Sequence, residues 1–116
     1  MDLTTTLKIG HSYTRDEIHE LLGGDKQCYL PHVGGRIVCG CFDPAFNKAA
    51  PIKIDVGNAP KVLEYARLLV QVRNVIPVFL KERVKQWRYD GMYQPVAFDE
   101  DLHRIRAVSY RRHNAV

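Results

Sequence analysis

The sequence predicts an α+β domain in which a small mixed or antiparallel β-barrel is flanked by about two to three helices. Three observations support this fold class. About six segments have the length and apolar character of strands, a number that can close or nearly close into a small barrel. Two other segments place apolar residues at helical spacing. The 116 residues, 46% of them apolar, provide for a single domain with one core over residues 1–116.

The N-terminal part is expected to contain a helix followed by a hairpin. Thr14 can cap a helix, Glu17 completes a capping box with it, and the pair Gly23-Gly24 ends the helix. The segments 28–33 and 36–42 have strand character and lie on either side of a Gly-Gly pair, which is typical of a tight turn. A hairpin therefore follows the first helix.

A strand and a second helix are expected in the middle of the chain. Apolar and polar residues alternate over 52–56, which predicts a half-buried strand. Pro60 then stands where a first helical turn tolerates proline. Five residues at helical spacing form the stripe that would cover one face of the sheet. They are Val62, Tyr65, Ala66, Leu69 and Val72.

The segment 75–98 combines an apolar strand, a basic linker and an aromatic hairpin. Residues 75–80 are an apolar run of strand length, and Asp90-Gly91 is the dipeptide that a two-residue type I′ turn prefers. Such a turn would pair Tyr89 with Met92. Alternation in the resulting hairpin would place four side chains on one face. These are Trp87, Tyr89, Met92 and Gln94.

The net charge of +4 is carried by the C-terminal residues. Four arginines and no acidic residues follow Asp101, while the other 13 basic residues are balanced by 13 acidic ones. We expect Asp99 to cap a short final helix that leads into a basic tail from about residue 102. A basic binding surface on the body must therefore come from local clustering.

The order of elements resembles that of small β-barrel modules in the PUA-like superfamily, nearest its SRA-YDG branch. The resemblance covers roughly the C-terminal half. It rests on the Trp-x-Tyr-x-Gly-x-Tyr pattern of 87–93, which contains Tyr89-Asp-Gly91, and on 35–42 as an earlier barrel strand. SRA modules read modified bases in DNA. The resemblance therefore implies a nucleic-acid binding module, for DNA rather than RNA, with a pocket of stacking aromatic rings and a polar group.

Six residues are candidates for contacting a base. A protein that extrudes a base needs flat rings to stack on it and a polar group for its edge. The alternative is that aromatic residues such as Trp87 and Tyr89 pack in the core or across strands. The base-binding candidates are Trp87, Tyr89, Tyr93, Tyr13, Phe42 and Asp43.

The basic linker supplies the candidates for contacting phosphates. Cations that neutralise phosphates bind DNA in a salt-dependent way. The phosphate-binding candidates are Lys81, Arg83, Lys85 and Arg88. The tail offers a second, weaker set with the same chemistry. It consists of Arg104, Arg106, Arg111 and Arg112.

We expect no metal site and no cofactor. Cys28, His32, Cys39 and Cys41 are zinc-competent, but their spacing is not a standard one, and strand geometry separates the two last by about 7 Å. Chelators should then leave the melting temperature unchanged. The chain has no Gly-x-Ser-x-Gly motif, no Gly-Lys-Ser/Thr loop and no carboxylate pair at a suggestive spacing. The sequence therefore predicts a protein that is not an enzyme and has no catalytic residues.

The alternative function is a protein-interaction module, such as a small inhibitor or regulator with a protein partner. The near-zero charge of the body favours it, and Trp, Tyr and Arg are also the residues preferred at interface hot spots. No apolar run reaches the roughly 18 residues of a membrane span, so no membrane partner is expected. The three cysteines, an odd number, favour a cytoplasmic protein.

Overall fold

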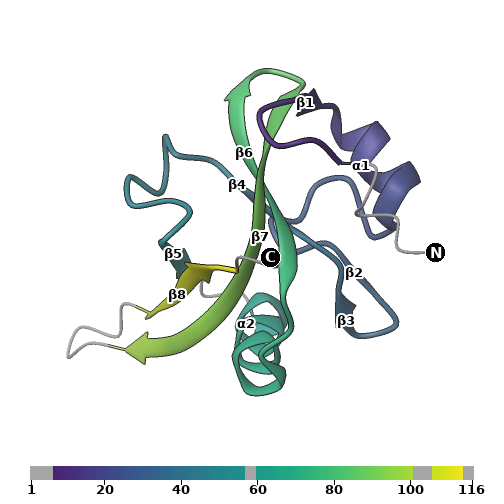
Figure 1. Cartoon of the computed structure of the whole chain (residues 1–116). Coiled ribbons are helices and arrows are strands. Elements are labelled where there is room, and N and C mark those ends of the chain that lie inside the picture. The colour runs from purple at the N-terminus through teal and green to yellow at the C-terminus, as the bar shows by residue number, and fades with distance from the viewer. Residues whose placement is uncertain (1–6, 57–59, 101–105, 114–116) are drawn as a thin grey trace.

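A computed structural model describes residues 7–56, 60–100 and 106–113. Within them, two helices and eight strands follow one another along the chain (Figure 1). The α+β class is therefore confirmed. The helices are α1 (Arg15–Leu22) and α2 (Pro60–Val72), and the strands are β1 (Ser12–Tyr13), β2 (His32–Val33), β3 (Arg36–Ile37), β4 (Gly40–Phe42), β5 (Lys53–Val56), β6 (Ile76–Arg83), β7 (Gln86–Glu100) and β8 (Arg106–Arg112).

The main sheet is mixed and curls into a half-barrel. Its strand order is β4-β6-β7-β8-β5, and β1 pairs with β7 beside this path. The β4 and β6 strands run parallel, whereas the other neighbours are antiparallel. Strand β7 is long enough to pair with β6 over its first half and with β8 over its second half. Strand β7 therefore bends and joins the β4–β6 part of the sheet to the β8–β5 part (Figure 1).

Helix α1 begins and ends where the sequence predicts. The Thr14 hydroxyl accepts a hydrogen bond from the backbone N–H of Glu17 (3.1 Å), and the Glu17 carboxylate accepts one from the backbone N–H of Thr14 (2.9 Å). This capping box satisfies two amide groups that the first helical turn leaves without partners. Gly23 follows the helix with a φ of 84°, a conformation that favours glycine.

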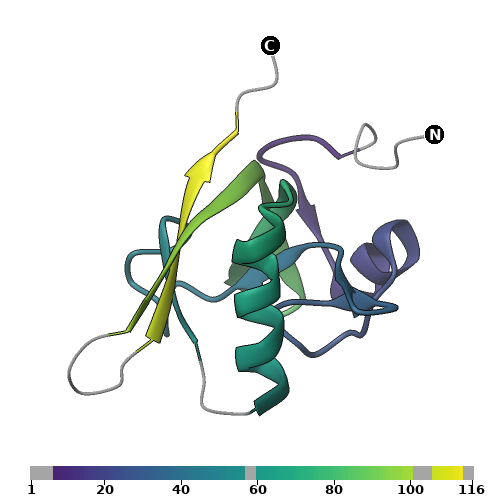
Figure 2. The ribbon, with the colours of Figure 1, turned by 90° about the horizontal axis from the view of Figure 1, so that it is seen from below.

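Helix α2 also starts at the predicted proline and lies across one side of the sheet (Figure 2). Ala66 and Leu69 are buried, as expected for its apolar stripe. Val72 is 52% exposed, so the buried stripe ends before it, and the side chain of Val62 lies outside the described part. Neither described helix is long and apolar enough to cross a membrane.

Strand β6 separates two hydrophobic cores, whereas the sequence predicts one. Side chains alternate across a strand. Ile76, Val78 and Leu80 accordingly join the core that contains α2, whereas Phe79 joins the one that contains α1. We call them the α2-side core and the α1-side core. Five consecutive residues of β6 are buried because both of its faces are covered.

The predicted turn at Asp90-Gly91 is wrong, because this dipeptide lies inside the continuous strand β7. The β6–β7 hairpin turns instead at Val84 and Lys85, between the paired Arg83 and Gln86. Lys85 adopts a φ of 62°, a conformation that is unfavourable for residues other than glycine. Because no glycine stands at this turn, the sequence does not reveal it. Tyr89 and Met92 are therefore neighbours on one strand and do not pair.

Trp87, Tyr89 and Met92 nevertheless share a face, as predicted, but for another reason. All three pack in or against the α1-side core. In a regular strand, residues 89 and 92 would point to opposite faces. The register shifts by one residue between them, at a β-bulge opposite Val78 and Phe79. The extra residue shifts the alternation of side chains by one position, so Met92 points to the same face of the sheet as Tyr89.

The final helix predicted after Asp99 is also wrong for the described residues. Strand β7 continues to Glu100, and the expected basic tail forms strand β8 from Arg106. Residues 101–105 lie outside the described part. Three apolar side chains bury this strand in the sheet, and packing there outweighs the helical pattern. They are Ala107, Val108 and Tyr110.

Candidate nucleic-acid interface

The Tyr89-Asp90-Gly91 motif forms the β-bulge in strand β7. Val78 pairs with Gly91 and Phe79 pairs with Tyr89, so Asp90 is the extra residue. Gly91 has a φ of 114°, and a Cβ atom built there would lie 3.0 Å from Nη1 of Arg112. Glycine is therefore needed for both the backbone conformation and the close approach of the arginine. Bulges of this kind re-aim a side chain.

The side chain that is re-aimed is the Asp90 carboxylate, which holds a polar cluster together. It accepts hydrogen bonds from the Tyr93 hydroxyl and from Nη2 of Arg112 (3.1 Å). Arg112 also donates to the Asp90 carbonyl (2.8 Å) and to the Tyr93 hydroxyl oxygen (2.8 Å). Nη2 of Arg88 lies 3.8 Å from the same carboxylate. The motif therefore positions two arginines of β7 and β8.

Sequence reasoning missed this cluster because it assigned Asp90 to a turn. The signal that could have found it is the setting of the Asp-Gly pair. Apolar and aromatic residues alternate with polar ones both before and after this pair. If one residue is counted as an insertion, the two alternating segments can form a single strand. A bulge containing glycine fits that pattern as well as a two-residue turn does.

The Tyr93 hydroxyl titrates differently in the folded and unfolded protein. Burial, followed by the hydrogen bond to Asp90, raises the pKa of Tyr93 from 10 to about 12. A raised folded-state pKa means that this contribution to stability is complete below pH 10 and is lost as the pH rises toward 12. We expect the stability of Tyr93→Phe to fall less between these pH values, as measured by urea unfolding. Superimposable pH profiles of the two proteins would contradict this.

Three of the six base-binding candidates are core residues. Phe42 and Tyr93 lie in the α2-side core and Tyr89 lies in the α1-side core, with at most 5% of each residue exposed. The Phe42 ring centroid is 5.3 Å from that of Tyr110, and the Tyr89 centroid is 5.4 Å from that of Phe79. Such ring pairs stabilise a fold through burial and edge interactions.

Tyr13 and Trp87 are half-buried and pack against the α1-side core. The Tyr13 ring meets Phe79 edge-on, with centroids 6.0 Å apart. Two cations lie over the Trp87 ring: the guanidinium carbon of Arg15 at 5.3 Å and Nζ of Lys81 at 5.7 Å. The ring therefore forms cation–π contacts, which a stacking base would have to replace.

Asp43, the one polar base-binding candidate, is half-buried directly after β4. Its carboxylate accepts a hydrogen bond from the backbone N–H of Ala45 (2.9 Å), and its carbonyl accepts two more from Phe46 and Asn47. These bonds form the turn that leaves the sheet. The structure thus divides the aromatic candidates between two cores, with Asp43 next to Phe42.

The four phosphate-binding candidates have different partners. Lys81 lies over Trp87, and Arg88 forms a salt bridge with Glu82 (3.0 Å) besides its contact with Asp90. Arg83 and Lys85 are exposed at the hairpin tip and have no ion pair with a described residue. These two are therefore the members of the set that are most available to an anion.

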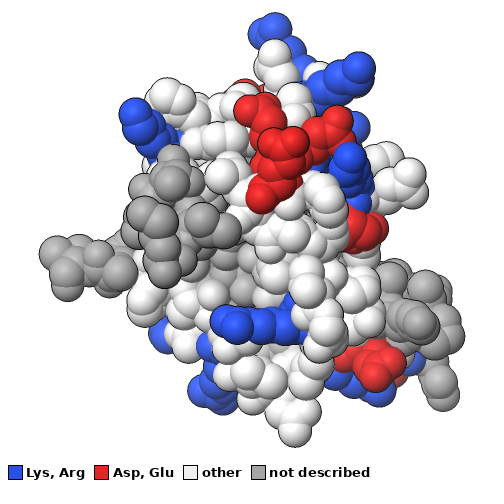
Figure 3. Space-filling model, turned by 90° about the vertical axis from the view of Figure 1, so that its right-hand side faces the viewer, with Lys and Arg blue, Asp and Glu red and all other residues white. Residues whose placement is uncertain are grey.

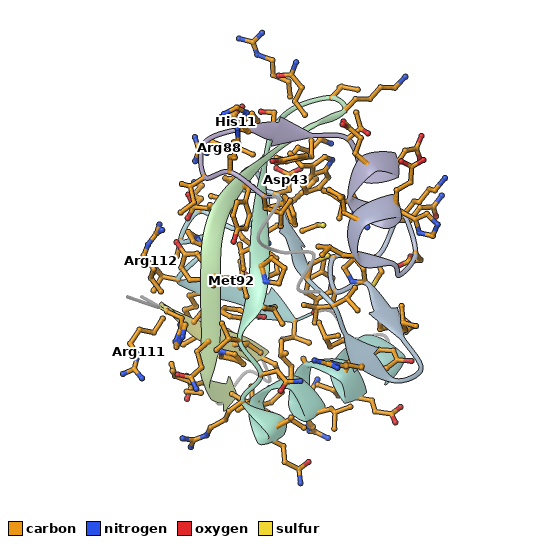
Figure 4. The ribbon with its side chains drawn as sticks, turned by 45° about the vertical axis from the view of Figure 1, so that its right-hand side comes forward. His11, Asp43, Arg88, Met92, Arg111 and Arg112 are labelled. Carbon is orange, nitrogen blue, oxygen red and sulfur yellow. The ribbon has the colours of Figure 1, made fainter. Side chains whose placement is uncertain are left out.

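Two arginines of β8 extend this basic surface. Arg112 pairs across the sheet with Tyr93, and Arg111 pairs with Gln94. At about 3.3 Å per residue, they lie about 25 Å along β7 from the hairpin tip. In the view of Figure 4, Arg88, Arg111 and Arg112 project to the same side of β7, with His11 beside Arg88, although the consecutive Arg111 and Arg112 belong to opposite faces of β8. We call this set of cations along β7 the basic strip. It consists of Arg83, Lys85, Arg88, Arg111 and Arg112.

The other arginines of the expected tail do not add to the strip. Arg106 forms a salt bridge with Glu100 (3.2 Å), and Arg104 lies outside the described residues.

Acidic side chains gather over α1, where Asp16, Glu17 and Glu20 are exposed. Figure 3 shows acidic side chains over this helix and basic ones projecting from the hairpin tip above it. A polyanion would accordingly be repelled from the α1 face.

No family model and no curated protein matches the sequence of this chain. Its structure is similar to that of the SRA domain of SUVH5 in a complex with hemi-methylated CG DNA. The identity is 14%, the TM-score is 0.68, and the match covers 94% of this chain and 90% of that one.

Two structures of ScoMcrA are also similar. One is the type IV phosphorothioation-dependent restriction endonuclease, of which the match covers 25%, and the other is its sulfur-binding and SRA domains with phosphorothioated DNA, of which it covers 38%. Both matches have 15% identity, a TM-score of 0.57 and 89% coverage of this chain. The SRA-like fold that the sequence predicts is thereby confirmed.

Proposed function

We propose that the protein is a non-enzymatic DNA-binding module that recognises modified or flipped bases. The observation that carries the proposal is the basic strip, which runs along the central strand of an SRA-like fold. The complexes of the similar SUVH5 and ScoMcrA domains with hemi-methylated and phosphorothioated DNA support DNA as the ligand. RNA is the less favoured nucleic acid.

The strip has the dimensions and the charge for a phosphate backbone. Its length of about 25 Å corresponds to about seven base pairs at about 3.4 Å per base pair. Arg83, Lys85 and Arg111 are exposed and have no ion pair with a described residue. Arg88 and Arg112 are already held by Glu82 and Asp90. The first three should therefore neutralise phosphates, while the paired arginines fix the geometry of the strip.

Base recognition is assigned to the candidates that keep accessible surface. Trp87 and Tyr13 are half-buried neighbours on paired strands, and Lys81 lies over the Trp87 ring, whereas Phe42, Tyr89 and Tyr93 are core residues. We assign base stacking to Trp87, because its ring is the largest of these and because Lys81, one of the two cations over it, forms no ion pair with a described residue. Arg15 is held by the carbonyls of Asp25 and Cys28, so a base would replace Lys81. This replacement costs less than entry of the base into a packed core.

We expect Arg83→Gln/Lys85→Gln to weaken DNA binding more at low salt than at high salt. Each lost phosphate contact lowers the slope of log K against log salt by about 0.9, so the double variant should lose about 1.8. Glutamine keeps the first three carbon atoms of each side chain and removes the charge, and no β-branched residue is introduced at Lys85, whose φ is 62°. The measurement is a salt titration by fluorescence anisotropy with a duplex of random sequence.

The matched control is Lys26→Gln/Arg36→Gln, which removes the same charge away from the strip. Lys26 forms a salt bridge with Asp16 on the α1 face, and Arg36 lies in the β2–β3 hairpin. We expect the control to keep the wild-type slope. Equal slopes for the two double variants would show that only net charge matters and would remove the strip from the proposal.

The second candidate function, a protein-interaction module, is favoured by a different surface. A pocket of about 240 Å³ lies between the β2–β3 hairpin and α2. Ile37 and Leu69 line it, and the partly exposed Leu68 and Val72 border it. Apolar pockets of this kind suit the anchor residues of a partner protein. Salt-independent or absent DNA binding, together with loss of a partner in Leu68→Ser, would favour this function.

A further inference from the structure

We propose that Asp25, Cys28 and His32 form a binding site for a divalent metal ion of the zinc type. One carboxylate oxygen, one thiol sulfur and one imidazole nitrogen all lie within 4.8 Å of one another. The three residues come from the segment between α1 and β2 and from the first position of β2. This site is separate from the basic strip and independent of the proposed DNA binding.

The ligand set matches the preferences of zinc. Zinc binds Cys sulfur at about 2.3 Å and His nitrogen or carboxylate oxygen at about 2.0–2.2 Å, in tetrahedral geometry. Ligand atoms around such an ion lie about 3.3–3.7 Å apart. The cluster must therefore close by about 1 Å, and exposed Asp25 can move by that amount through side-chain rotation.

The contacts of His32 suit a histidine that binds an ion through Nε2. Its Nδ1 lies 3.3 Å from the Leu30 carbonyl oxygen, and its ring stacks on Tyr65 with centroids 4.1 Å apart. A ring that donates from Nδ1 keeps Nε2 free of a proton and able to bind an ion. A backbone carbonyl behind the ligating histidine is a common feature of zinc sites.

Asp25 and Cys28 are held together by backbone contacts. One Asp25 carboxylate oxygen accepts hydrogen bonds from the N–H groups of Gln27 (3.3 Å) and Cys28 (2.8 Å), which leaves the second oxygen for an ion. Arg15 donates to the carbonyl of Cys28 (2.9 Å) and to that of Asp25 (3.3 Å) from α1. The loop is therefore arranged before any ion binds, which lowers the entropic cost of binding.

This site replaces the sequence-based expectations of no metal site and of a melting temperature that chelators leave unchanged, because its ligand set differs from the one that the sequence analysis rejected. Cys39 and Cys41 are buried in the α1-side core, and Asp25 joins Cys28 and His32 in their place. The described residues supply three ligands, so water would take the fourth tetrahedral position. Such an ion would join the loop after α1 to the β2–β3 hairpin.

The test is a titration of metal-free protein with Co²⁺, followed by displacement with Zn²⁺. A tetrahedral site with a thiolate should give visible cobalt bands and a near-ultraviolet sulfur-to-cobalt charge-transfer band at one ion per chain. We expect Cys28→Ser to abolish the charge-transfer band, and Asp25→Asn and His32→Gln to weaken binding at least about tenfold. Zn²⁺ should raise the melting temperature of the wild type, and EDTA should reverse the rise.

The controls separate a built site from adventitious binding. His11→Gln removes another exposed histidine, outside the loop between α1 and β2, and should bind cobalt as the wild type does. Asp25→Asn keeps an oxygen that can accept the loop hydrogen bonds, so circular dichroism should show that it is folded. Absence of the charge-transfer band in the wild type, or equal affinities of the wild type and Asp25→Asn, would overturn the proposal.

Discussion

Replacing Tyr93 by alanine is expected to lower the free energy of unfolding by about 3–5 kcal/mol, the usual cost of truncating a buried aromatic residue. The residue is 2% exposed in the α2-side core, and its hydroxyl bonds to both Asp90 and Arg112. A domain of this size has a total stability of about 5–15 kcal/mol, so the variant should melt early or express poorly. Urea unfolding with circular dichroism measures the loss.

Trp87→Ala is the variant to compare with Tyr93→Ala, because the pair distinguishes a core residue from a base-stacking residue. Trp87 is half-buried beneath Arg15 and Lys81, so its loss should cost less stability than the loss of Tyr93. If Trp87 stacks on a base, its replacement should weaken DNA binding by about 1–3 kcal/mol. A stable Tyr93→Ala protein that has lost DNA binding would reverse the assignment, and an unaffected Trp87→Ala would remove the proposed stacking residue.

Gly91→Ala is expected to have the second largest effect, a loss of about 1–3 kcal/mol from backbone strain alone. The φ of 114° at Gly91 is unfavourable for alanine, and the new Cβ would lie 3.0 Å from Nη1 of Arg112. The arginine would have to move, which would weaken its bonds to Asp90. We therefore expect the variant to lose stability and, because Arg112 is displaced from the basic strip, to bind DNA with altered affinity.

Gly34→Ala is the matched control for this prediction. Gly34 also has a positive φ, 56°, but a Cβ there would meet nothing within 4 Å. Its loss should be limited to the left-handed backbone penalty of about 1–2 kcal/mol. Equal losses at the two positions would mean that the contact between Gly91 and Arg112 contributes nothing to the fold.

The sequence by itself determined the elements whose signals are local. The capping box of Thr14 and Glu17 specifies the start of α1, and the Gly34-Gly35 pair specifies the β2–β3 turn. Alternation predicted β5, and the proline predicted the start of α2. In each case neighbouring residues alone decide the backbone conformation, because the relevant hydrogen bonds and φ values lie within a few positions. The resemblance to SRA modules came from the aromatic pattern of 87–93 and from 35–42.

Only the tertiary structure decided how the Asp90-Gly91 pair is used. A turn and a bulge both require a positive φ, so the dipeptide suits either. The choice depends on β8, which pairs with β7 only if β7 continues beyond Gly91 and whose Arg112 then bonds to Asp90. Residues 106–112 likewise form a strand because the sheet offers them a buried place, which a local helical pattern cannot reveal.

The positions of the candidate side chains also depended on contacts between distant segments. The sequence identified Trp87 and the cations of the β6–β7 hairpin, but burial of Phe42, Tyr89 and Tyr93 follows from the two cores on opposite faces of β6. The meeting of Asp25 with Cys28 and His32 likewise depends on the path of the loop between α1 and β2. Residue types suggest which chemistry is available, whereas long-range packing decides which side chains meet, because burial and proximity belong to the whole fold.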